Sequence, residues 1–477
     1  MKIKNILFLF VICAIFLLIT LVPLNIKAQS ISQNLQNSIS EIDDIYTIYL
    51  PSILKIYPRT NVFGITMAQL TEAQGITPIA EAGTTWTRRS LNWAEIEPIE
   101  GWRIWNKNFE QELIRANNLG IRTILIIENT PSWALKPGFN CGPVASDKFP
   151  LFGNFVYDTV KRYSVEPYNV QYWELWNEPD VKENLGCWGD PNDKKYFGGK
   201  YYGQMLTYVY TKFKEANPLS QVLVGGLLLD CDPNNPPIGR TCVESKFLQG
   251  ILEAGGGPYF DGVSFHSYDY YRSLGQYGNS NWNSSSNTNG PVSIKKSEYL
   301  TDILNRYGVS SKYLLNTETA LFYGPIVDYP LCVEDAPPDL EETKTYYVIH
   351  SYATSVAYKY RANIWYAAFG GRCAAMFNSD LSPLPAFNAY RFAINKLEEA
   401  NFIRDVTEFS GIMGYEFQIP GRKLWVIWSK DGSDHPIKLP KEPVLINKVG
   451  PDGIAIQVAN TMSQTVGLSP YFIEFSN

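Results

Sequence analysis

Metal-ligating patterns are sparse in this 477-residue sequence. It has three histidines, His266, His350 and His435, which are far apart and are accompanied by no CxxC pair. The residue spacing of a zinc site is therefore missing. No GxGxxG phosphate-binding loop follows the first expected strand, which argues against a doubly wound dinucleotide-binding fold. The sequence implies no metal and no cofactor.

The sequence also lacks an excess of basic charge. Lys and Arg number 41 against 47 Asp and Glu, which gives a net charge of −6. No basic cluster offsets this balance, so the sequence argues against nucleic acid as a partner.

Beyond the N-terminus, no apolar run is long enough to cross a bilayer. Two lysines precede an apolar run from Ile6 to Leu24, and Ala28 is a small residue suited to cleavage. This pattern predicts a signal peptide at residues 1–28 and a secreted protein. A membrane anchor is the alternative, because the run nearly spans a bilayer and Ile26 is not the small residue preferred before a cut.

The richest motif is WELWNEPD, from Trp173 to Asp180. The apolar run Val170–Trp176 predicts a buried strand, which ends at Asn177 and Glu178 because Pro179 cannot continue the ladder. Burial between tryptophans disfavours the charged form of a carboxyl, and this suits a proton donor. The alternative is a turn or capping carboxylate that closes a strand–helix loop.

This motif resembles the acid/base signature of clan A glycoside hydrolases, which are (β/α)8 barrels, and is closest to families 39 (β-xylosidase-like) and 5 (cellulase-like). In that clan the Glu after Asn is the general acid/base on strand four, and a Glu on strand seven is the nucleophile. The resemblance implies that Glu178 is the acid/base and that Asn177 holds the sugar 2-hydroxyl. It implies that Glu318, in KYLLNTETAL, is the nucleophile, with Asp269 as the alternative.

Short apolar runs alternate with amphipathic segments over residues 58–403, as in successive βα units. We predict an α/β fold, a (β/α)8 barrel, in this region. Residues 29–57 are expected to be a linker and an extended segment. Short β runs separated by turn signals predict a small antiparallel β-sandwich at residues 404–477. The eight expected strands are Val62–Met67, Thr84–Arg89, Arg122–Glu128, Val170–Trp176, Gln221–Leu227, Gly262–His266, Tyr313–Asn316 and Asn363–Ala367.

Six cysteines remain once Cys13 in the N-terminal run is set aside, an even number that suits an oxidising compartment. Cys231 and Cys242 bracket a short Pro/Asn-rich loop and are expected to pair. Six cysteines allow fifteen connectivities. On the predicted barrel the other four lie in neighbouring loops, which suggests the pairs Cys141 with Cys187 and Cys332 with Cys373 and leaves other pairings open.

Further residues match positions of the clan. Arg88 ends strand two and resembles the Arg that supports the nucleophile, since a guanidinium forks onto a carboxylate; its neighbour Arg89 points inward if the alternation of faces is reversed. On strand six, His266 and Tyr268 share one face. Clan members carry a His and a Tyr there, one lining the sugar subsite and the other bonded to the nucleophile.

Two tryptophans match aromatic positions of the clan. Trp133, after strand three, resembles the loop Trp at the substrate rim and is expected to be a stacking platform or a core residue. Trp365, on strand eight, resembles the aromatic residue that floors the cleavage subsite. Tyr366 or Phe369 takes that place if the register differs. Residues 269–290 are expected to form a long loop that shapes the cleft.

The resemblance implies a retaining glycoside hydrolase that cleaves β-glycosidic bonds in a poly- or oligosaccharide by double displacement. An aromatic content of 14% agrees with stacking on sugar rings, although a large core also uses aromatic residues. The alternatives are a glycan-binding surface protein without catalysis and a transglycosylase that shares the first half-reaction. Contact with a membrane is expected only through an N-terminal anchor.

Overall fold

The computed structural model describes residues 62–181, 188–324, 332 and 335–477. The predicted signal peptide or anchor and the predicted linker lie outside these residues. Among the described residues, no helix combines the length and hydropathy needed to cross a membrane.

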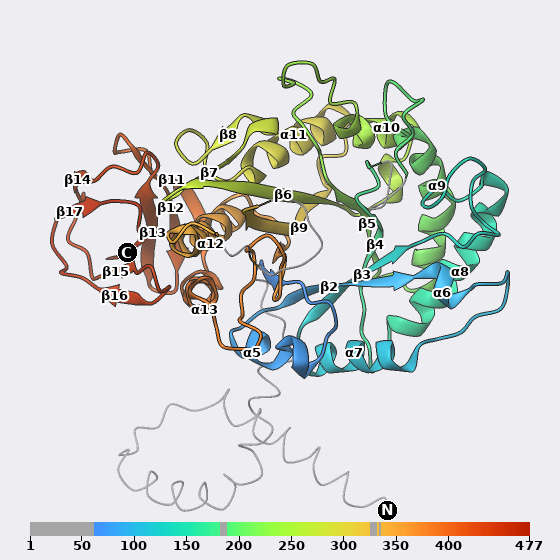
Figure 1. The fold of residues 1–477 in the computed structure, drawn as a ribbon, viewed down its shortest axis with the longest axis horizontal. Helices are drawn as coiled ribbons and strands as arrows, with labels where there is room; N and C mark the ends of the chain where they lie inside the picture. Colours follow the sequence, from blue (N-terminus) through green and yellow to red (C-terminus); the bar gives the residue numbers. More distant parts are fainter. Residues whose placement is uncertain (1–61, 182–187, 325–331, 333–334) are drawn as a thin grey trace, which may run out of the picture. The chain divides into compact units, whose positions relative to one another are not determined.

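Eight parallel strands close into a barrel, because each pairs with the next and the last, β10, pairs with the first, β1 (Figure 1). The predicted (β/α)8 barrel is confirmed. The strands follow the expected order, and those for which sequence and structure agree in both bounds are β3 and β5. The barrel strands are β1 (Phe63–Ile65), β2 (Trp86–Asn92), β3 (Arg122–Glu128), β4 (Tyr172–Asn177), β5 (Gln221–Leu227), β6 (Gly262–Ser273), β9 (Tyr313–Phe322) and β10 (Asn363–Trp365).

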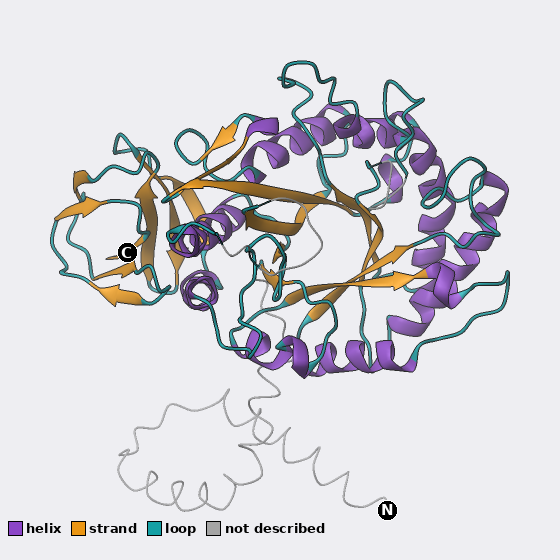
Figure 2. Cartoon of the chain, in the orientation of Figure 1, coloured by secondary structure: helices purple, strands orange, loops and turns teal. Residues whose placement is uncertain are grey.

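Helices lie around the outside of the barrel strands (Figure 2). Capping side chains help to set where these helices begin. The Asn106 side chain caps α7 by accepting hydrogen bonds from the Asn108 and Phe109 N–H groups, which lack partners within the helix. The α-helices are α5 (Ile76–Glu81), α6 (Trp93–Ile96), α7 (Lys107–Asn118), α8 (Phe149–Tyr163), α9 (Gly199–Ala216), α10 (Phe247–Glu253), α11 (Ser293–Arg306), α12 (Leu340–Ala357) and α13 (Pro385–Leu397), and the short 3-10 helices are η1 (Glu72–Gln74), η2 (Ser146–Lys148), η3 (Glu244–Lys246), η4 (Gly257–Tyr259) and η5 (Ser280–Trp282).

The barrel interior changes from apolar to charged along the strands. Near the strand beginnings, Trp86, Ile124, Leu223 and Leu315 form a buried apolar cluster. Two residues further along β2, on the same face, lies Arg88, because side chains alternate across a strand with a period of two. The apolar layer thus forms the floor below the polar groups at the carboxyl ends of the strands.

The prediction of a long loop at residues 269–290 is wrong over most of that stretch. Strand β6 continues to Ser273, and its chain returns through β7 (Gln276–Asn279) and β8 (Ser284–Ser285) as an antiparallel extension of the sheet. Trp282 within it is buried and donates to the Leu229 carbonyl. The tyrosines of this stretch, which favour strands, extend the sheet.

The C-terminal region forms a six-stranded antiparallel sheet with a separate two-stranded sheet, which confirms the predicted β-sandwich. Trp425 and Trp428 are buried and belong to apolar clusters of the core. The six strands, in spatial order, are β11 (Asn401–Asp405), β12 (Ile412–Ile419), β13 (Arg422–Ser429), β18 (Tyr471–Ser476), β15 (Leu445–Val449) and β16 (Ala455–Gln457), and the pair is β14 (His435–Lys438) and β17 (Ser463–Val466).

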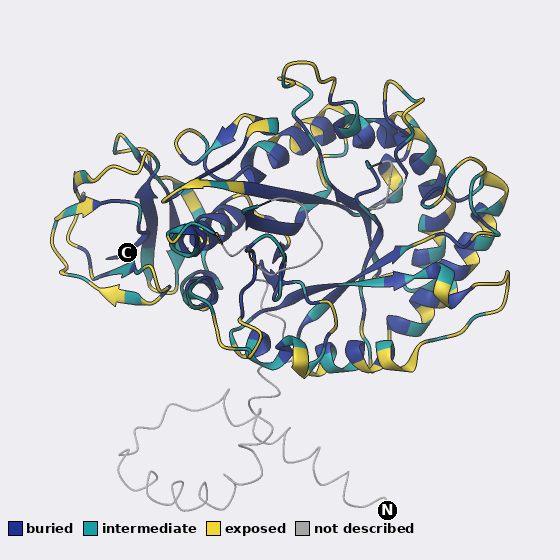
Figure 3. Ribbon diagram, viewed as in Figure 1, coloured by how far each residue is buried: buried dark blue, intermediate teal, exposed yellow. Residues whose placement is uncertain are grey.

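This sheet packs on helix α12 of the barrel. The Trp428 ring stacks on His350, with centroids 4.2 Å apart, and the Tyr415 hydroxyl lies 3.1 Å from the Thr354 hydroxyl. Burial therefore continues from the barrel into the sheet (Figure 3).

Two of the predicted disulfides are confirmed, Cys231–Cys242 and Cys332–Cys373. The second joins the loops after β9 and β10. Cys141 is also disulfide-bonded, but Cys187, its predicted partner, lies outside the described residues.

Candidate active site

The chain bends sharply where β4 ends. Trp176 and Glu178 have φ values of 62° and 43°, a left-handed conformation that residues with a Cβ adopt only at a cost. The Glu178 N–H donates to the Gly226 carbonyl on neighbouring β5, at 2.9 Å. The chain thus turns away from the direction of β4 immediately before Glu178, the predicted acid/base.

Two successive glycines in β5 make room for this arrangement. A Cβ on Gly225 would lie 2.2 Å from the Trp176 carbonyl oxygen, and a Cβ on Gly226 would lie 2.2 Å from His266 Nε2. The bent end of β4 and the His266 ring therefore both require glycine at these positions. These residues were not predicted, although a glycine pair inside an apolar strand signals a close approach of another group.

Replacing Gly226 by alanine is expected to lower kcat/KM by about 10- to 100-fold, because a shift of roughly 1 Å in a catalytic group has that effect. Overpacking should also destabilise the fold by about 1–3 kcal/mol. Gly371→Ala is the matched control, since its Cβ would meet no atom within 4 Å. Steady-state kinetics and thermal unfolding compare the two variants; equal activity in both would contradict the role given to Gly226.

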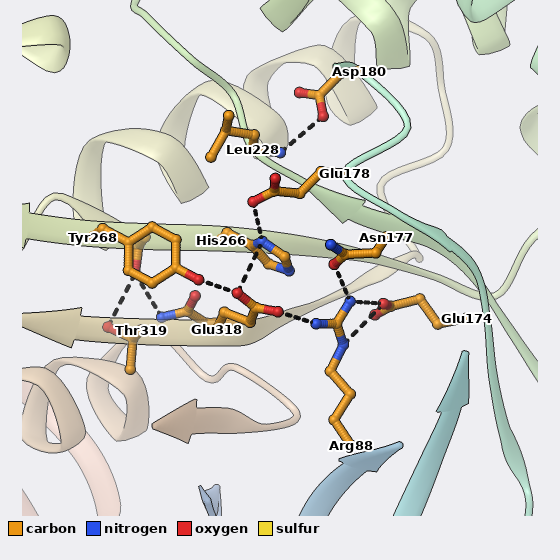
Figure 4. Close-up of polar contacts among 12 residues, drawn as sticks. Arg88, Glu174, Asn177, Glu178, Asp180, Leu228, His266, Tyr268, Glu318 and Thr319 are labelled. Carbon is orange, nitrogen blue, oxygen red and sulfur yellow. Dashed lines mark hydrogen bonds and ion pairs between the residues drawn. The ribbon is translucent and has the colours of Figure 1, made fainter. Parts of the chain in front are cut away.

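The two predicted carboxylates meet at His266. The His266 Nδ1 atom lies 2.8 Å from Glu178 Oε1 and 3.5 Å from Glu318 Oε2 (Figure 4). One side-chain oxygen of each Glu and a nitrogen of this His all lie within 4.8 Å of one another. Glu178 and Glu318 are 5% and 7% exposed, so both are largely withdrawn from solvent but still reachable.

Two donors hold Glu318. The Arg88 guanidinium binds one carboxylate oxygen and the Tyr268 hydroxyl donates to the other. Arg88 also donates through Nε to Glu174, at 3.0 Å, and through Nη2 to Asn177 Oδ1, at 2.8 Å. The Arg88 guanidinium thus ties the ends of β2, β4 and β9 together.

The structure decides between the two neighbouring arginines of β2. Arg88 points into the barrel, whereas Arg89 donates through Nε to Glu112 on α7, at 2.8 Å. Glu174, the first Glu of WELWNEPD, is fully buried and was not predicted as a site residue. Glu174 could have been recognised because it is two residues from Tyr172, which packs on the inner apolar cluster. Residues two apart in a strand share a face, so Glu174 also points into the barrel.

Burial controls the protonation of the site. It raises the pKa of Glu178 to about 7, with Arg88 and Lys296 acting in the opposite direction. It lowers the pKa of His266 to about 4, so this imidazole is neutral at ordinary pH. Burial and the neighbouring Glu318 raise the pKa of Tyr268 well above its usual value, so the phenol keeps the proton that it donates.

Glu178, His266 and Glu318 form a compact polar trio, in which His266 Nδ1, Glu178 Oε1 and both oxygens of Glu318 already have partners. A cation here would compete with the Arg88 guanidinium for Glu318 and with the hydrogen bond between His266 and Glu178. The arrangement suits proton transfer from one carboxyl and attack by the other.

The alternative nucleophile, Asp269, lies elsewhere on β6. Its carboxyl is fully buried and accepts hydrogen bonds from the Val292 N–H, at 2.9 Å, and the Tyr347 hydroxyl, at 3.1 Å. Because these contacts attach β6 to neighbouring helices, Asp269 has a structural environment, and the structure disfavours it as the nucleophile.

The aromatic floor needs a correction. Trp365 is 0% exposed and donates to the Ala374 carbonyl at 2.8 Å, so a sugar cannot stack on it. Its alternative Tyr366 is 38% exposed and packs edge-on against Tyr268, with centroids 6.4 Å apart. The other alternative, Phe369, packs on Phe377, so Tyr366 fits the floor best.

Trp133 lies on a different wall. It is half-buried, packs edge-on against Trp93 with centroids 5.6 Å apart, and donates to the Glu97 carbonyl at 2.9 Å. The Lys148 Nζ atom lies over the Trp133 ring, 5.7 Å from its centroid. These contacts fix the ring, and its use as a stacking platform stays a prediction.

No protein-family model and no curated protein matches the chain, whereas solved structures do. A family 39 glycoside hydrolase from the gut symbiont Bacteroides cellulosilyticus WH2 is 19% identical, covers 87% of this chain and 81% of its own, and has a TM-score of 0.65. A GH30 endoxylanase from Clostridium papyrosolvens C71 is 12% identical, with 87% and 96% covered and a TM-score of 0.56.

A third solved structure is AbfB, a family 51 α-L-arabinofuranosidase from Bifidobacterium longum. It is 13% identical, with 88% of this chain and 96% of its own covered and a TM-score of 0.57. At such identities the similarity establishes the fold. The predicted likeness to clan A barrels of the family 39 type is confirmed at that level.

Proposed function

We propose that the protein is a retaining glycoside hydrolase that cleaves β-glycosidic bonds in a poly- or oligosaccharide. In the first step Glu318 attacks the anomeric carbon, and Glu178 gives its proton to the departing glycosidic oxygen. In the second step Glu178 takes a proton from water, whose oxygen displaces Glu318 from the sugar. Two displacements at one carbon restore the starting configuration.

The separation of the two carboxylates carries this proposal. Retaining enzymes hold their carboxyl groups about 5–5.5 Å apart, whereas inverting enzymes leave roughly 6.5–9.5 Å for a water molecule. Oxygens of Glu178 and Glu318 lie within 4.8 Å of each other. That distance suits a pair that contacts one sugar carbon and its leaving oxygen, without an intervening water.

The environments of the two carboxyls support different roles for them. Glu318 accepts from Arg88 and Tyr268, and such contacts aim an ionised oxygen for attack. Glu178 has its pKa raised to about 7 by burial, so it still holds a proton near neutrality and can donate it. Environments that separate the protonation of two neighbouring carboxyls are typical of acid and nucleophile pairs.

Neighbouring residues have supporting roles in this proposal. Asn177 accepts from Arg88, which fixes its amide beside the acid/base, where it binds the sugar 2-hydroxyl. Tyr366 provides the aromatic floor, and His266 orients Glu178. The solved neighbours are named as enzymes that act on glycosides, which supports a carbohydrate substrate. The disulfides suit export to an oxidising compartment.

The proposal is tested by the stereochemistry of hydrolysis. Aryl β-glycosides of several sugars are screened, and proton NMR records which anomer of the product forms first with the best substrate. We expect the β-anomer before mutarotation. The α-anomer as first product would contradict double displacement, and no turnover on aryl glycosides or polysaccharides would contradict the hydrolase itself.

The pH profile of kcat/KM should fall on the alkaline side with a midpoint near pH 7. Because burial raises the pKa of Glu178 to about 7, the proton needed by the leaving group is present below that pH and lost above it. The measurement uses a substrate with a poor leaving group. The comparison is a dinitrophenyl glycoside, whose leaving group needs no proton and which should show a much weaker alkaline decline. Identical profiles for both substrates would contradict the assignment.

A further inference from the structure

A lysine ammonium is buried behind the acid/base. Lys296 on α11 is 2% exposed, which is rare for a lysine without compensating partners. Its Nζ donates to the Leu228 carbonyl at 2.6 Å and to the His266 carbonyl at 2.9 Å. Lys296 therefore joins the end of β5, strand β6 and helix α11.

Both carbonyls belong to residues that frame Glu178. His266 places its ring nitrogen 2.8 Å from Glu178. Leu228 is held a second time, because its N–H donates at 2.9 Å to Asp180 (Figure 4), which is two residues beyond Glu178 in the chain. Leu228 is thus bound at both of its backbone polar groups, at the carbonyl by Lys296 and at the N–H by Asp180.

Carboxyl groups surround this ammonium. Burial raises the pKa of Asp180 and of Asp269 to about 7, as it does for Glu178. Burial lowers the pKa of Lys296 to about 8, and the nearby carboxylates oppose that decrease. Lys296 is therefore still mainly charged at pH 7.

The charges that face Glu178 come from several elements. Arg88 on β2 and Lys296 on α11 are the cations, and both lower its pKa. Asp230, after β5, raises it. The remaining neighbours are the neutral His266, Glu318 and, on its own loop, Asp180. Of the two cations, Arg88 also binds Glu318 directly, so Lys296 is the one that can be replaced without removing a hydrogen-bond donor to Glu318.

We propose that Lys296 is a positioning residue for the reaction, which fixes the two carbonyls that frame Glu178 and places a positive charge behind that carboxyl. This inference rests on the proposed function and adds to it a residue that contacts no substrate. A buried lysine that only stabilised the fold would change unfolding and leave the alkaline limb of the pH profile where it is.

Lys296→Met removes the charge and keeps most of the stem. We expect the alkaline limb of kcat/KM to move upward by roughly half to one pH unit, because loss of a neighbouring cation raises the pKa of Glu178. We also expect kcat at the optimum to fall about 10-fold, since Glu178 is less well held. Lys295→Met is the control: this half-buried neighbour bonds to the Asn283 carbonyl instead, and its profile should match the wild type.

Lys296→Gln keeps a neutral donor and tests the charge if the Met variant does not fold. Its limb should also move upward, whereas Lys296→Arg keeps the charge and should retain the wild-type limb with a lower kcat. A wild-type limb in either folded neutral variant would overturn the proposal, and so would an upward shift in the Arg variant. Failure of the proposed function is distinguishable, because it would leave wild type inactive or Glu178→Ala fully active.

Discussion

Replacing Glu318 by alanine is expected to lower kcat by about 10⁴- to 10⁶-fold, the order of loss that follows removal of a covalent nucleophile. Asp269, the alternative nucleophile, does not take its place, because its carboxyl is bound to Val292 and Tyr347. Arg88 and Tyr268 would remain, and Arg88 would still be paired with Glu174. The variant should therefore fold and bind substrate, which circular dichroism and ligand-dependent thermal shifts can measure.

Azide makes this prediction specific to the chemistry. A small anion that enters the space left by Glu318 can attack the anomeric carbon once, from the face that the carboxylate used. One displacement inverts configuration, so a β-glycoside should give an α-glycosyl azide, identified by NMR. Glu95→Ala is the control, since Glu95 is exposed and bonds locally to Asn92, and it should keep wild-type activity. Full activity of Glu318→Ala, or a β-azide product, would contradict the nucleophile assignment.

The position of the proposed catalytic pair could be predicted from sequence, because the resemblance identified the two residues and barrel topology brings them together. Glu178 follows an apolar strand that a proline ends, and Glu318 lies two residues beyond the end of the predicted strand Tyr313–Asn316. Parallel strands of a barrel bring their carboxyl ends to one face, and the structure places the two carboxyls together there. The period of two along a strand placed Tyr268 on the same face as His266. The resemblance implied that one of the two contacts the nucleophile, and in the structure the Tyr268 hydroxyl donates to Glu318. The resemblance and the patterns within single strands together carried this information.

The supporting residues could not be predicted because they depend on contacts between distant segments. Lys295 and Lys296 are adjacent on an amphipathic helix, and nothing local shows that the second is buried. Glu174 looks like an ordinary strand residue until the fold places Arg88 of β2 beside it on the inner face of the barrel, with only β3 between their two strands. The close approach of His266 to Gly226 likewise arises only when β5 and β6 pair.

Register accounts for the error at strand eight. Trp365 and Tyr366 are consecutive, so one of them faces the core and the other the mouth, and sequence alone did not decide which. In the structure Trp365 donates to the Ala374 carbonyl, whereas Tyr366 contacts Tyr268. Complete burial of the Trp365 indole stabilises the fold through packing, and it leaves no ring face open to a ligand. The error at residues 269–290 differs, because a polar composition obscured strands that extend an existing sheet.

Glu178→Ala should separate the two half-reactions, because Glu178 serves each of them differently. Without a proton donor, glycosides with poor leaving groups should lose about 10²- to 10⁴-fold in kcat/KM, the usual contribution of general acid catalysis. A dinitrophenyl glycoside needs no proton, so its kcat/KM should remain within about 10-fold of wild type. Its kcat should nevertheless fall, since water is no longer activated and the glycosyl-enzyme accumulates as a burst followed by slow turnover.

Azide should relieve that slow step and report its geometry. In Glu178→Ala the anion occupies the space of the acid/base and attacks the sugar already bound to Glu318, so two displacements occur in all. The product is then a β-glycosyl azide, opposite in configuration to the product expected from Glu318→Ala. Stopped-flow kinetics and NMR on the same two variants therefore assign the roles independently. The same anomer from both variants would contradict them, because it would mean that the two carboxylates act from one face of the sugar rather than from opposite sides of the anomeric carbon.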